Sequence, residues 1–175
     1  MKVLIFTIVI VVLASCSQER RANNEFVDKL VLDSLNINVL KYDSSYKYIF
    51  PEAMEIADLT REEITECELL LKAYIANYNV QAKKRFEEIS KNHPGLKFSL
   101  DNFTIELKNY GRQYVAAINN DGEKVVYVNC FCHPSEFDYR DKELVQVEDG
   151  GNCFFNFKVD IKRKRIFDFR ENGAA

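Results

Sequence analysis

The chain lacks several residue types that common catalytic and binding machinery requires. Its 175 residues include no tryptophan and only two histidines, three prolines and six glycines. There is no glycine-rich phosphate loop, and spacing alone assembles no group of nucleophile, histidine and carboxylate. The sequence therefore predicts no catalytic residues and no cofactor, and it favours a protein that is not an enzyme.

An excess of basic residues is also missing. Lysine and arginine total 24 against 27 aspartate and glutamate, a net charge of -3. A chain with this balance has no positive field to hold nucleic-acid phosphates, so no nucleic-acid partner is predicted. Hydrophobic residues make up 47 %, which is enough to bury one core.

No hydrophobic run is long enough to cross a membrane as a helix. The longest lies at the N-terminus after Met1-Lys2, where Val3 to Leu13 is apolar except for Thr7. A spanning helix needs about 20 residues, so this segment predicts a secretion signal instead. It ends in Leu13-Ala14-Ser15-Cys16, which resembles the lipobox of bacterial lipoproteins. The resemblance implies cleavage before Cys16 and diacylglycerol on its thiol.

These features predict three regions: a signal peptide at 1–15, a lipidated tether at 16–24 and one domain at 25–175. Acyl chains on Cys16 would hold the mature protein to a membrane without spanning it. Ser17 after the cysteine is typical of sorting to the outer membrane of Gram-negative bacteria, which places the protein in the cell envelope. The alternatives are ordinary cleavage near Ala14, which leaves Cys16 unmodified, and an uncleaved anchor.

One long amphipathic helix is predicted over residues 61–91. Thr60 and Glu63 match a capping box, and Asn92-His93-Pro94-Gly95 ends the helix. An apolar stripe with gaps of three and four residues follows the cap. Its members are Ile64, Cys67, Leu71, Ile75, Tyr78, Ala82, Phe86 and Ile89.

After the helix the apolar period changes to two, which predicts strands. Asn119-Asn120-Asp121-Gly122 and Asp149-Gly150-Gly151 supply turns. Short links favour an antiparallel meander, so the predicted fold is α+β, with the long helix on a curved antiparallel sheet, broadly cystatin-like or similar to nuclear transport factor 2 in shape. Strands are expected near 103–107, 114–118, 124–133, 144–147, 153–161 and 166–170, with another at Tyr46–Phe50; Phe26–Leu40 fits either a helix or a strand.

The region from Leu59 to the C-terminus resembles small lipoproteins of Bacteroidota-type bacteria. The segments that carry this resemblance are Arg112-Gln113-Tyr114-Val115, Val128-Asn129-Cys130-Phe131-Cys132, Asp149-Gly150-Gly151-Asn152-Cys153-Phe154-Phe155-Asn156 and Asn172-Gly173-Ala174-Ala175. The resemblance agrees with the predicted cell-envelope location and fold, and it implies no activity.

Four cysteines remain beside Cys16: Cys67, Cys130, Cys132 and Cys153. An even number in an oxidising compartment suggests a disulfide. Cys130 and Cys132 lie two apart on one strand and cannot easily bridge each other, so one of them is expected to pair with Cys153. Cys67, on the buried stripe of the helix, could reach the other. The alternative is that all four are free buried thiols.

The sequence predicts no metal site. Cys130, Cys132, His133 and Cys153 are ligand types that zinc accepts. On a regular strand, however, the His133 side chain points away from Cys130 and Cys132. The segment also lacks the Cys-x-x-Cys turn that brings two thiolates together.

Two other segments have both an ordinary and a functional interpretation. Asp149-Gly150-Gly151-Asn152 is a hairpin turn or a backbone site for an anion. Lys162-Arg163-Lys164-Arg165 is a solvated hairpin tip or a contact with phospholipid headgroups or an acidic partner. The ordinary interpretation is favoured for both.

These features favour a membrane-anchored cell-envelope lipoprotein that binds a protein or ligand without catalysis. An inhibitor or immunity protein would fit this class, because it needs only a stable complementary surface. The competing function is an enzyme or ligand carrier whose curved sheet encloses a pocket, with Asp138 or Glu148 as acid and base.

Overall fold

The computed structural model describes residues 36–51 and 53–173. The described residues belong to one compact unit. The predicted signal peptide at 1–15, the tether at 16–24 with Cys16, and the start of the predicted domain up to residue 35 lie outside the described residues.

Helix α2 (Arg61–Asn92) confirms the predicted helix and its cap. The Glu63 N–H donates to Thr60 Oγ1 at 3.2 Å, and the Thr60 N–H donates to Glu63 Oε2 at 2.9 Å. This reciprocal pair satisfies two of the backbone donors that a helix start leaves open. The fully buried members of the stripe are Ile64, Cys67, Leu71, Ile75 and Ala82.

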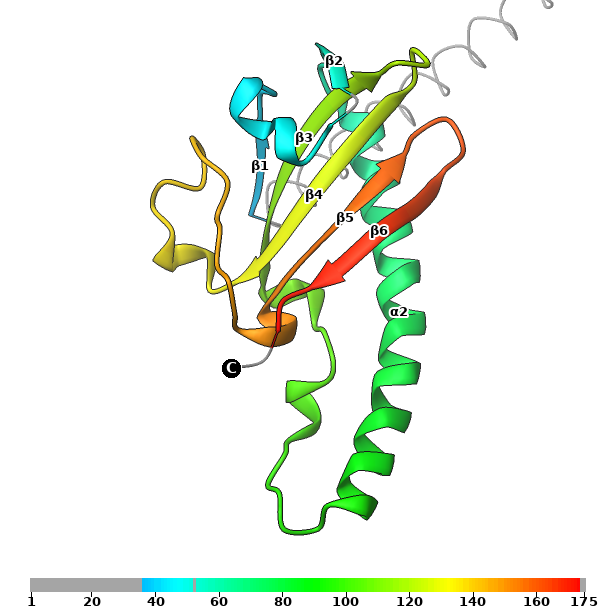
Figure 1. Cartoon of the computed structure of the whole chain (residues 1–175), viewed down its shortest axis with the longest axis vertical. Coiled ribbons are helices and arrows are strands. Elements are labelled where there is room, and N and C mark those ends of the chain that lie inside the picture. The colour runs from blue at the N-terminus through cyan, green and yellow to red at the C-terminus, as the bar shows by residue number, and fades with distance from the viewer. Residues whose placement is uncertain (1–35, 52, 174–175) are drawn as a thin grey trace, which may run out of the picture. The chain divides into compact units, whose positions relative to one another are not determined.

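Helix α2 packs on an open mixed sheet, which confirms the α+β class (Figure 1). Four antiparallel neighbours follow in chain order, as predicted for a meander. They are β3 (Tyr110–Asn119), β4 (Lys124–Cys132), β5 (Phe154–Asp160) and β6 (Arg165–Glu171). Gly122, at φ 72°, lies in the turn between β3 and β4 and donates its N–H to the Asn119 carbonyl at 3.0 Å.

Two short strands complete the sheet at the free edge of β3: the first lies at the end of the segment that fitted either a helix or a strand, and the second was not predicted. Strand β1 (Ile37–Leu40) pairs with β3 in parallel, and β2 (Ala53–Ile56) pairs with it antiparallel. Parallel neighbours need a long crossover connection. Here that connection contains β2 and α2, so the sheet is mixed rather than wholly antiparallel.

The face of the sheet toward α2 holds the main apolar core. Tyr114, Val128 and Phe157 lie side by side in register on β3, β4 and β5, and each is fully buried. Phe169 on β6 contacts the rings of Tyr74 and Tyr78 on α2. Each fully buried apolar side chain of this size contributes roughly 1.5–3 kcal/mol relative to an exposed one.

The opposite face is covered by the 3-10 helix η1 (Ser44–Tyr48) and by residues 133–153. Two buried polar side chains, Gln113 and Asn129, hold the latter segment in place, and Asn129 Nδ2 donates to the Val145 carbonyl at 2.8 Å. Gln113 Nε2 donates to the carbonyls of Arg140 and Glu143 at 2.7 and 2.6 Å, and the Val145 N–H donates to Gln113 Oε1 at 2.8 Å. The apolar cluster under this layer is Leu40, Tyr46, Ile49, Phe50, Val115, Ala117 and Leu144.

Three predicted strands are wrong. Residues 46–50 begin within η1, because the Asp43 side chain accepts the Ser45 N–H and starts a helical turn. Residues 103–107 run from the end of the short 3-10 helix η2 (Leu100–Asn102) to the start of another, η3 (Leu107–Asn109). Residues 144–147 are irregular, since buried Gln113 and Asn129 take the backbone hydrogen bonds that a strand neighbour would take.

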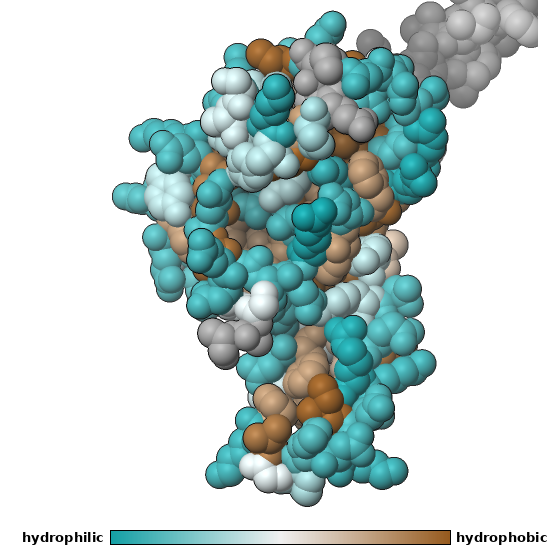
Figure 2. Space-filling model, viewed as in Figure 1, coloured by the Kyte–Doolittle hydropathy of each residue, from teal (hydrophilic) through white to brown (hydrophobic). Residues whose placement is uncertain are grey.

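Helix α2 continues beyond the sheet, where the chain turns back alongside it (Figure 1). Phe103 in the returning segment contacts the rings of Phe86 and Phe98. Leu96 and Phe98, in the loop after the helix, are 55 % and 43 % exposed. Figure 2 shows hydrophobic residues gathered at this end of a largely hydrophilic surface. No helix among the described residues is long and apolar enough to cross a membrane.

Candidate functional site

A polar cleft of about 840 Å³ opens at the end of the sheet where β4 ends and β5 begins. Three segments form most of its wall: residues 101–110, residues 132–135, and the short 3-10 helix η5 (Gly151–Cys153) with Gly150 before it; Asn36 lines it as well. Its size falls within the range of small-ligand sites. Most of its side chains are polar or charged, so it suits a polar ligand. They include Asp101, Glu106, Lys108, His133 and Asn152.

Asn152 fixes two walls of this cleft to each other. Its Nδ2 donates to the Asp101 and Thr104 carbonyls at 3.2 and 2.8 Å. The Tyr110 hydroxyl donates to the Asn152 carbonyl at 2.9 Å. These bonds hold η5 against residues 101–110, so the cleft is formed before any ligand arrives. In the sequence, Asn152 belongs to a segment that fits a hairpin turn or an anion site, and only its neighbours in the fold reveal this role.

A second asparagine holds the same wall against the long helix. Asn79 on α2 donates Nδ2 to the Ile105 carbonyl at 2.8 Å and accepts the Ile105 N–H at 2.9 Å. Asparagine is a weak helix former. Here its side chain forms the two backbone hydrogen bonds with Ile105 that a neighbouring strand would otherwise form. Residues 104–106 therefore form an irregular segment between η2 and η3 that is held to α2 and does not join the sheet.

The Cys132–Cys153 disulfide forms part of the cleft wall. It joins the end of β4 to η5, with a Cα–Cα distance of 5.1 Å. From the sequence, either Cys130 or Cys132 is expected to pair with Cys153. In the structure Cys130 lies opposite Phe155 inside the sheet, whereas Cys132 is the last residue of β4 and lies beside η5.

Cys67 and Cys130 are free and buried, and they do not bridge to each other. Burial raises the pKa of the Cys67 thiol to about 12. The pKa of Cys130 is also raised, chiefly by burial. Both thiols are therefore protonated at neutral pH, act as small apolar side chains and are poor nucleophiles.

His133 lies beside the disulfide, contrary to the sequence-based geometry. One ring nitrogen and the sulfur atoms of Cys132 and Cys153 all lie within 4.8 Å of one another. Side chains alternate only within a strand. This alternation does not extend to His133, because β4 ends at Cys132 and His133 adopts the left-handed conformation, at φ 51°. The expectation that the His133 side chain points away from Cys132 is therefore wrong, whereas the segment does lack a Cys-x-x-Cys turn. Cys130 is not part of the cluster.

The glycine-rich turn positions η5 at the mouth of the cleft. Gly150 has φ 92°, and a Cβ there would lie 2.7 Å from the Phe154 ring. Glycine is therefore required by both conformation and space. Gly150 and Asn152 of this turn line the cleft, whereas Asp149 does not.

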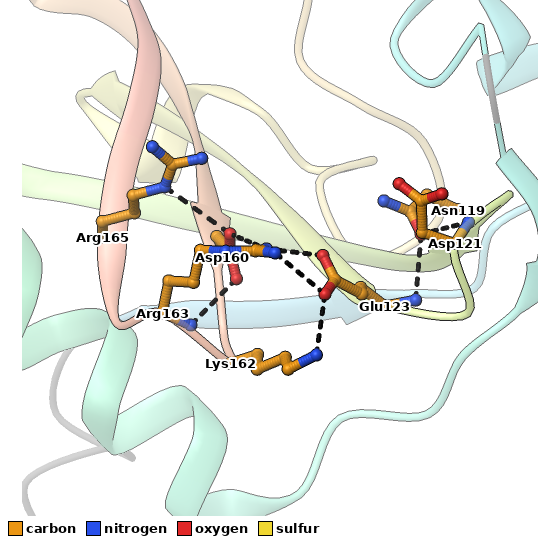
Figure 3. A network of polar contacts seen from close by, with 7 residues as sticks. All are labelled: Asn119, Asp121, Glu123, Asp160, Lys162, Arg163 and Arg165. Carbon is orange, nitrogen blue, oxygen red and sulfur yellow. Dashed lines mark hydrogen bonds and ion pairs between the residues drawn. The ribbon is translucent and has the colours of Figure 1, made fainter.

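The basic turn at 162–165 is neutralised by acidic neighbours (Figure 3). Arg163 lies between Glu123 and Asp160, and Lys162 Nζ is 2.9 Å from Glu123 Oε1. The remaining two basic side chains also have partners, Lys164 with Glu66 on α2 and Arg165 with Asp160. Compensated charges of this kind favour a solvated hairpin tip over a lipid-headgroup site.

The pairing in this turn predicts an acid-sensitive contribution to stability. Hydrogen bonds from Arg163 and Lys162 lower the pKa of Glu123 below its usual 4.5, and one from Arg163 lowers that of Asp160 below 3.8. A carboxylate with a lowered folded pKa stabilises the protein above its unfolded pKa, and that stabilisation is lost as pH falls through the folded value. Glu123→Gln should therefore be less stable than the natural protein at neutral pH, and the difference should shrink below about pH 4.5.

Urea unfolding measured from about pH 7 to about pH 3 checks this expectation. Glu106→Gln is the matched control, since the Glu106–Lys108 pair is exposed on both sides and should contribute almost nothing. A stability difference for Glu123→Gln that stays constant over this pH range would contradict the assignment.

The two carboxylates proposed for acid–base chemistry do not form an enclosed pair. Asp138 and Glu148 are both exposed, and the sheet on which they depended is open, with side chains packed on both faces. Glu148 lines a second surface pocket, of about 400 Å³, with Tyr48 and Tyr127, and Asp138 lies outside it.

Comparison with known proteins adds no assignment. No protein-family model, curated protein or solved structure matches the chain. The interpretation of the cleft therefore depends on its own geometry.

Proposed function

We propose that this protein is a lipid-anchored lipoprotein of the cell envelope, at the outer membrane of a Gram-negative bacterium, and that it binds a polar ligand or partner segment without catalysis. The segment Leu13-Ala14-Ser15-Cys16 supports the anchor on Cys16. Two or more acyl chains on one residue suffice for stable membrane attachment.

The polar cleft beside the disulfide is the observation that carries the binding role. Its walls come from three segments that Asn152, Tyr110 and the Cys132–Cys153 bond hold together. Loops fixed on a rigid sheet commonly present ligand-binding groups. Because the sheet already holds these loops in place, less conformational entropy is lost when a ligand binds. The side chains in the cleft offer both acceptors and donors for a polar ligand.

Lipidation is tested with Cys16→Ser in a bacterial host fed an alkyne-labelled fatty acid. We expect the natural protein to carry the label and to fractionate with membranes, and the variant to lose the label completely. Ser17→Ala is the matched control, because it changes the neighbouring residue and keeps the cysteine. Label on the Cys16→Ser protein, or natural protein that retains Met1, would show that the anchor is wrongly assigned.

Binding in the cleft is tested with a photo-crosslinking amino acid placed at Lys108 in intact cells. Lys108 lines the cleft and is exposed, whereas Lys84, on the exposed face of α2, provides the control position. We expect adducts at position 108 that are absent at position 84 and that diminish when Asn152→Ala loosens the wall. Equal adducts at both positions, or none at 108, would count against a binding role for the cleft.

A further inference from the structure

We infer that Cys132, His133 and Cys153 form a Zn²⁺ site in the reduced protein, and that this site and the disulfide are alternative states of the same two sulfur atoms. The three ligand atoms lie within 4.8 Å of one another. Around a tetrahedral zinc ion, bonds of about 2.3 Å to sulfur and about 2.1 Å to nitrogen place ligand atoms roughly 3.5–3.8 Å apart. Small side-chain rotations therefore suffice to bring all three onto one ion.

The backbone at His133 supports this assignment. A non-glycine residue in the left-handed region is uncommon and energetically costly, and such residues concentrate at functional positions. His133 is the first residue after β4 and has φ 51°, and its ring lies on the side of the two sulfur atoms. Pro134 follows at the start of a short 3-10 helix. A disulfide alone would not require an imidazole at this position.

The cleft allows both a reductant and a metal ion to reach the site. His133 is exposed, and Cys132 and Cys153 are half-buried in the wall. Asp101 and Glu106 line the same cleft with one lysine, Lys108, so the nearby charges favour a cation. With three protein ligands the fourth zinc position faces the cleft, where a water molecule or a ligand atom can occupy it.

The two states are linked by a balanced exchange. A dithiol reductant transfers two electrons to the Cys132–Cys153 bond, which breaks as the reductant forms its own disulfide, and both cysteines become thiols. Zn²⁺ then binds the two sulfur atoms as thiolates and the neutral imidazole of His133, with release of two protons. A disulfide oxidant reverses the sequence: it accepts two electrons and two protons and becomes two thiols, the Cys132–Cys153 bond forms again, and Zn²⁺ leaves because disulfide sulfur atoms no longer supply thiolate ligands.

The test uses the full chain with Cys16→Ser, purified in detergent, and Zn²⁺ as the probe in competition with a chromophoric chelator. After reduction with a phosphine we expect one Zn²⁺ per chain, and none when the disulfide is intact. Direct loss of a ligand in His133→Ala should weaken Zn²⁺ binding by at least the roughly 10- to 100-fold that outer-shell changes cause. His93→Ala, which alters the other histidine in the turn after α2, should leave the affinity unchanged.

A second measurement covers the case in which the reduced protein loses structure. Zn²⁺ should restore the circular dichroism of the reduced chain and slow the alkylation of Cys132 and Cys153, and both effects should fail in His133→Ala. The inference is overturned if the reduced chain binds no Zn²⁺, or if His133→Ala and His93→Ala bind it equally. The result is separate from the proposed function, since crosslinking in the cleft and lipidation of Cys16 do not depend on zinc.

Discussion

Replacing Arg112 with methionine is expected to lower the free energy of unfolding by about 3–5 kcal/mol, because it leaves a carboxylate without its partner in the core. Arg112 on β3 is only 1 % exposed, and its Nε lies 2.9 Å from Glu68 Oε1 on α2. The guanidinium also donates to the Tyr110 and Leu107 carbonyls at 2.8 and 3.0 Å. The substitution therefore removes the partner of a largely buried charge and of two carbonyl groups.

The size of this loss separates an ion-pair effect from simple loss of packing. Adding Glu68→Gln to Arg112→Met removes the unpaired charge while keeping an acceptor for the Tyr114 hydroxyl, which donates to Glu68 at 2.5 Å. The double variant should therefore be more stable than Arg112→Met alone. Lys108→Met, in an exposed pair, should cost less than about 1 kcal/mol. Urea unfolding at neutral pH measures all three, and a loss below about 1 kcal/mol for Arg112→Met would refute the argument.

Removing the Cys132–Cys153 disulfide is expected to lower the free energy of unfolding by about 3 kcal/mol. The bond closes a loop with a sequence separation of 21, and the chain-entropy argument attributes the effect to the greater freedom of the unfolded chain. The variant carries Cys132→Ser and Cys153→Ser together, so that no single thiol is left to form other disulfides. Urea unfolding with a chelator present measures the loss without any contribution from bound metal.

Two controls make this prediction specific to the one bond. Reductant should destabilise the natural protein by the same amount and should leave the double serine variant unchanged. In a Cys16→Ser background, alkylation of the denatured chain should modify two thiols without reductant, Cys67 and Cys130, and four after reduction. Four alkylated thiols without reductant would show that the disulfide does not form.

Elements governed by near neighbours could be predicted from the sequence. The Thr60–Glu63 capping box and the apolar stripe act within a few residues of the chain, and α2 begins and ends where they indicate. The turn at Gly122 likewise depends on local backbone conformation, and it sets the register of β3 and β4. The α+β class follows from these elements together.

Elements governed by distant partners could not be predicted. Apolar and polar residues alternate over 144–147 as in a strand. The backbone of this segment, however, forms hydrogen bonds with the side chains of Gln113 on β3 and Asn129 on β4. Residues 37–40 carry no decisive local pattern and become a strand only because β3 offers a free edge. Asn152 was visible in a glycine-rich turn, yet its role depends on carbonyl groups about 50 residues earlier in the chain.

The sequence by itself determined the long helix, the antiparallel order of β3 to β6 and the absence of an excess positive charge, because each depends on composition or short spacing; it left open whether any disulfide forms. Only the tertiary structure decided that Cys132 rather than Cys130 forms the bond and that His133 joins it. The physical reason is that side-chain alternation holds inside a strand and stops where the strand ends. At that point the left-handed backbone of His133, not the strand period, sets the direction of the imidazole.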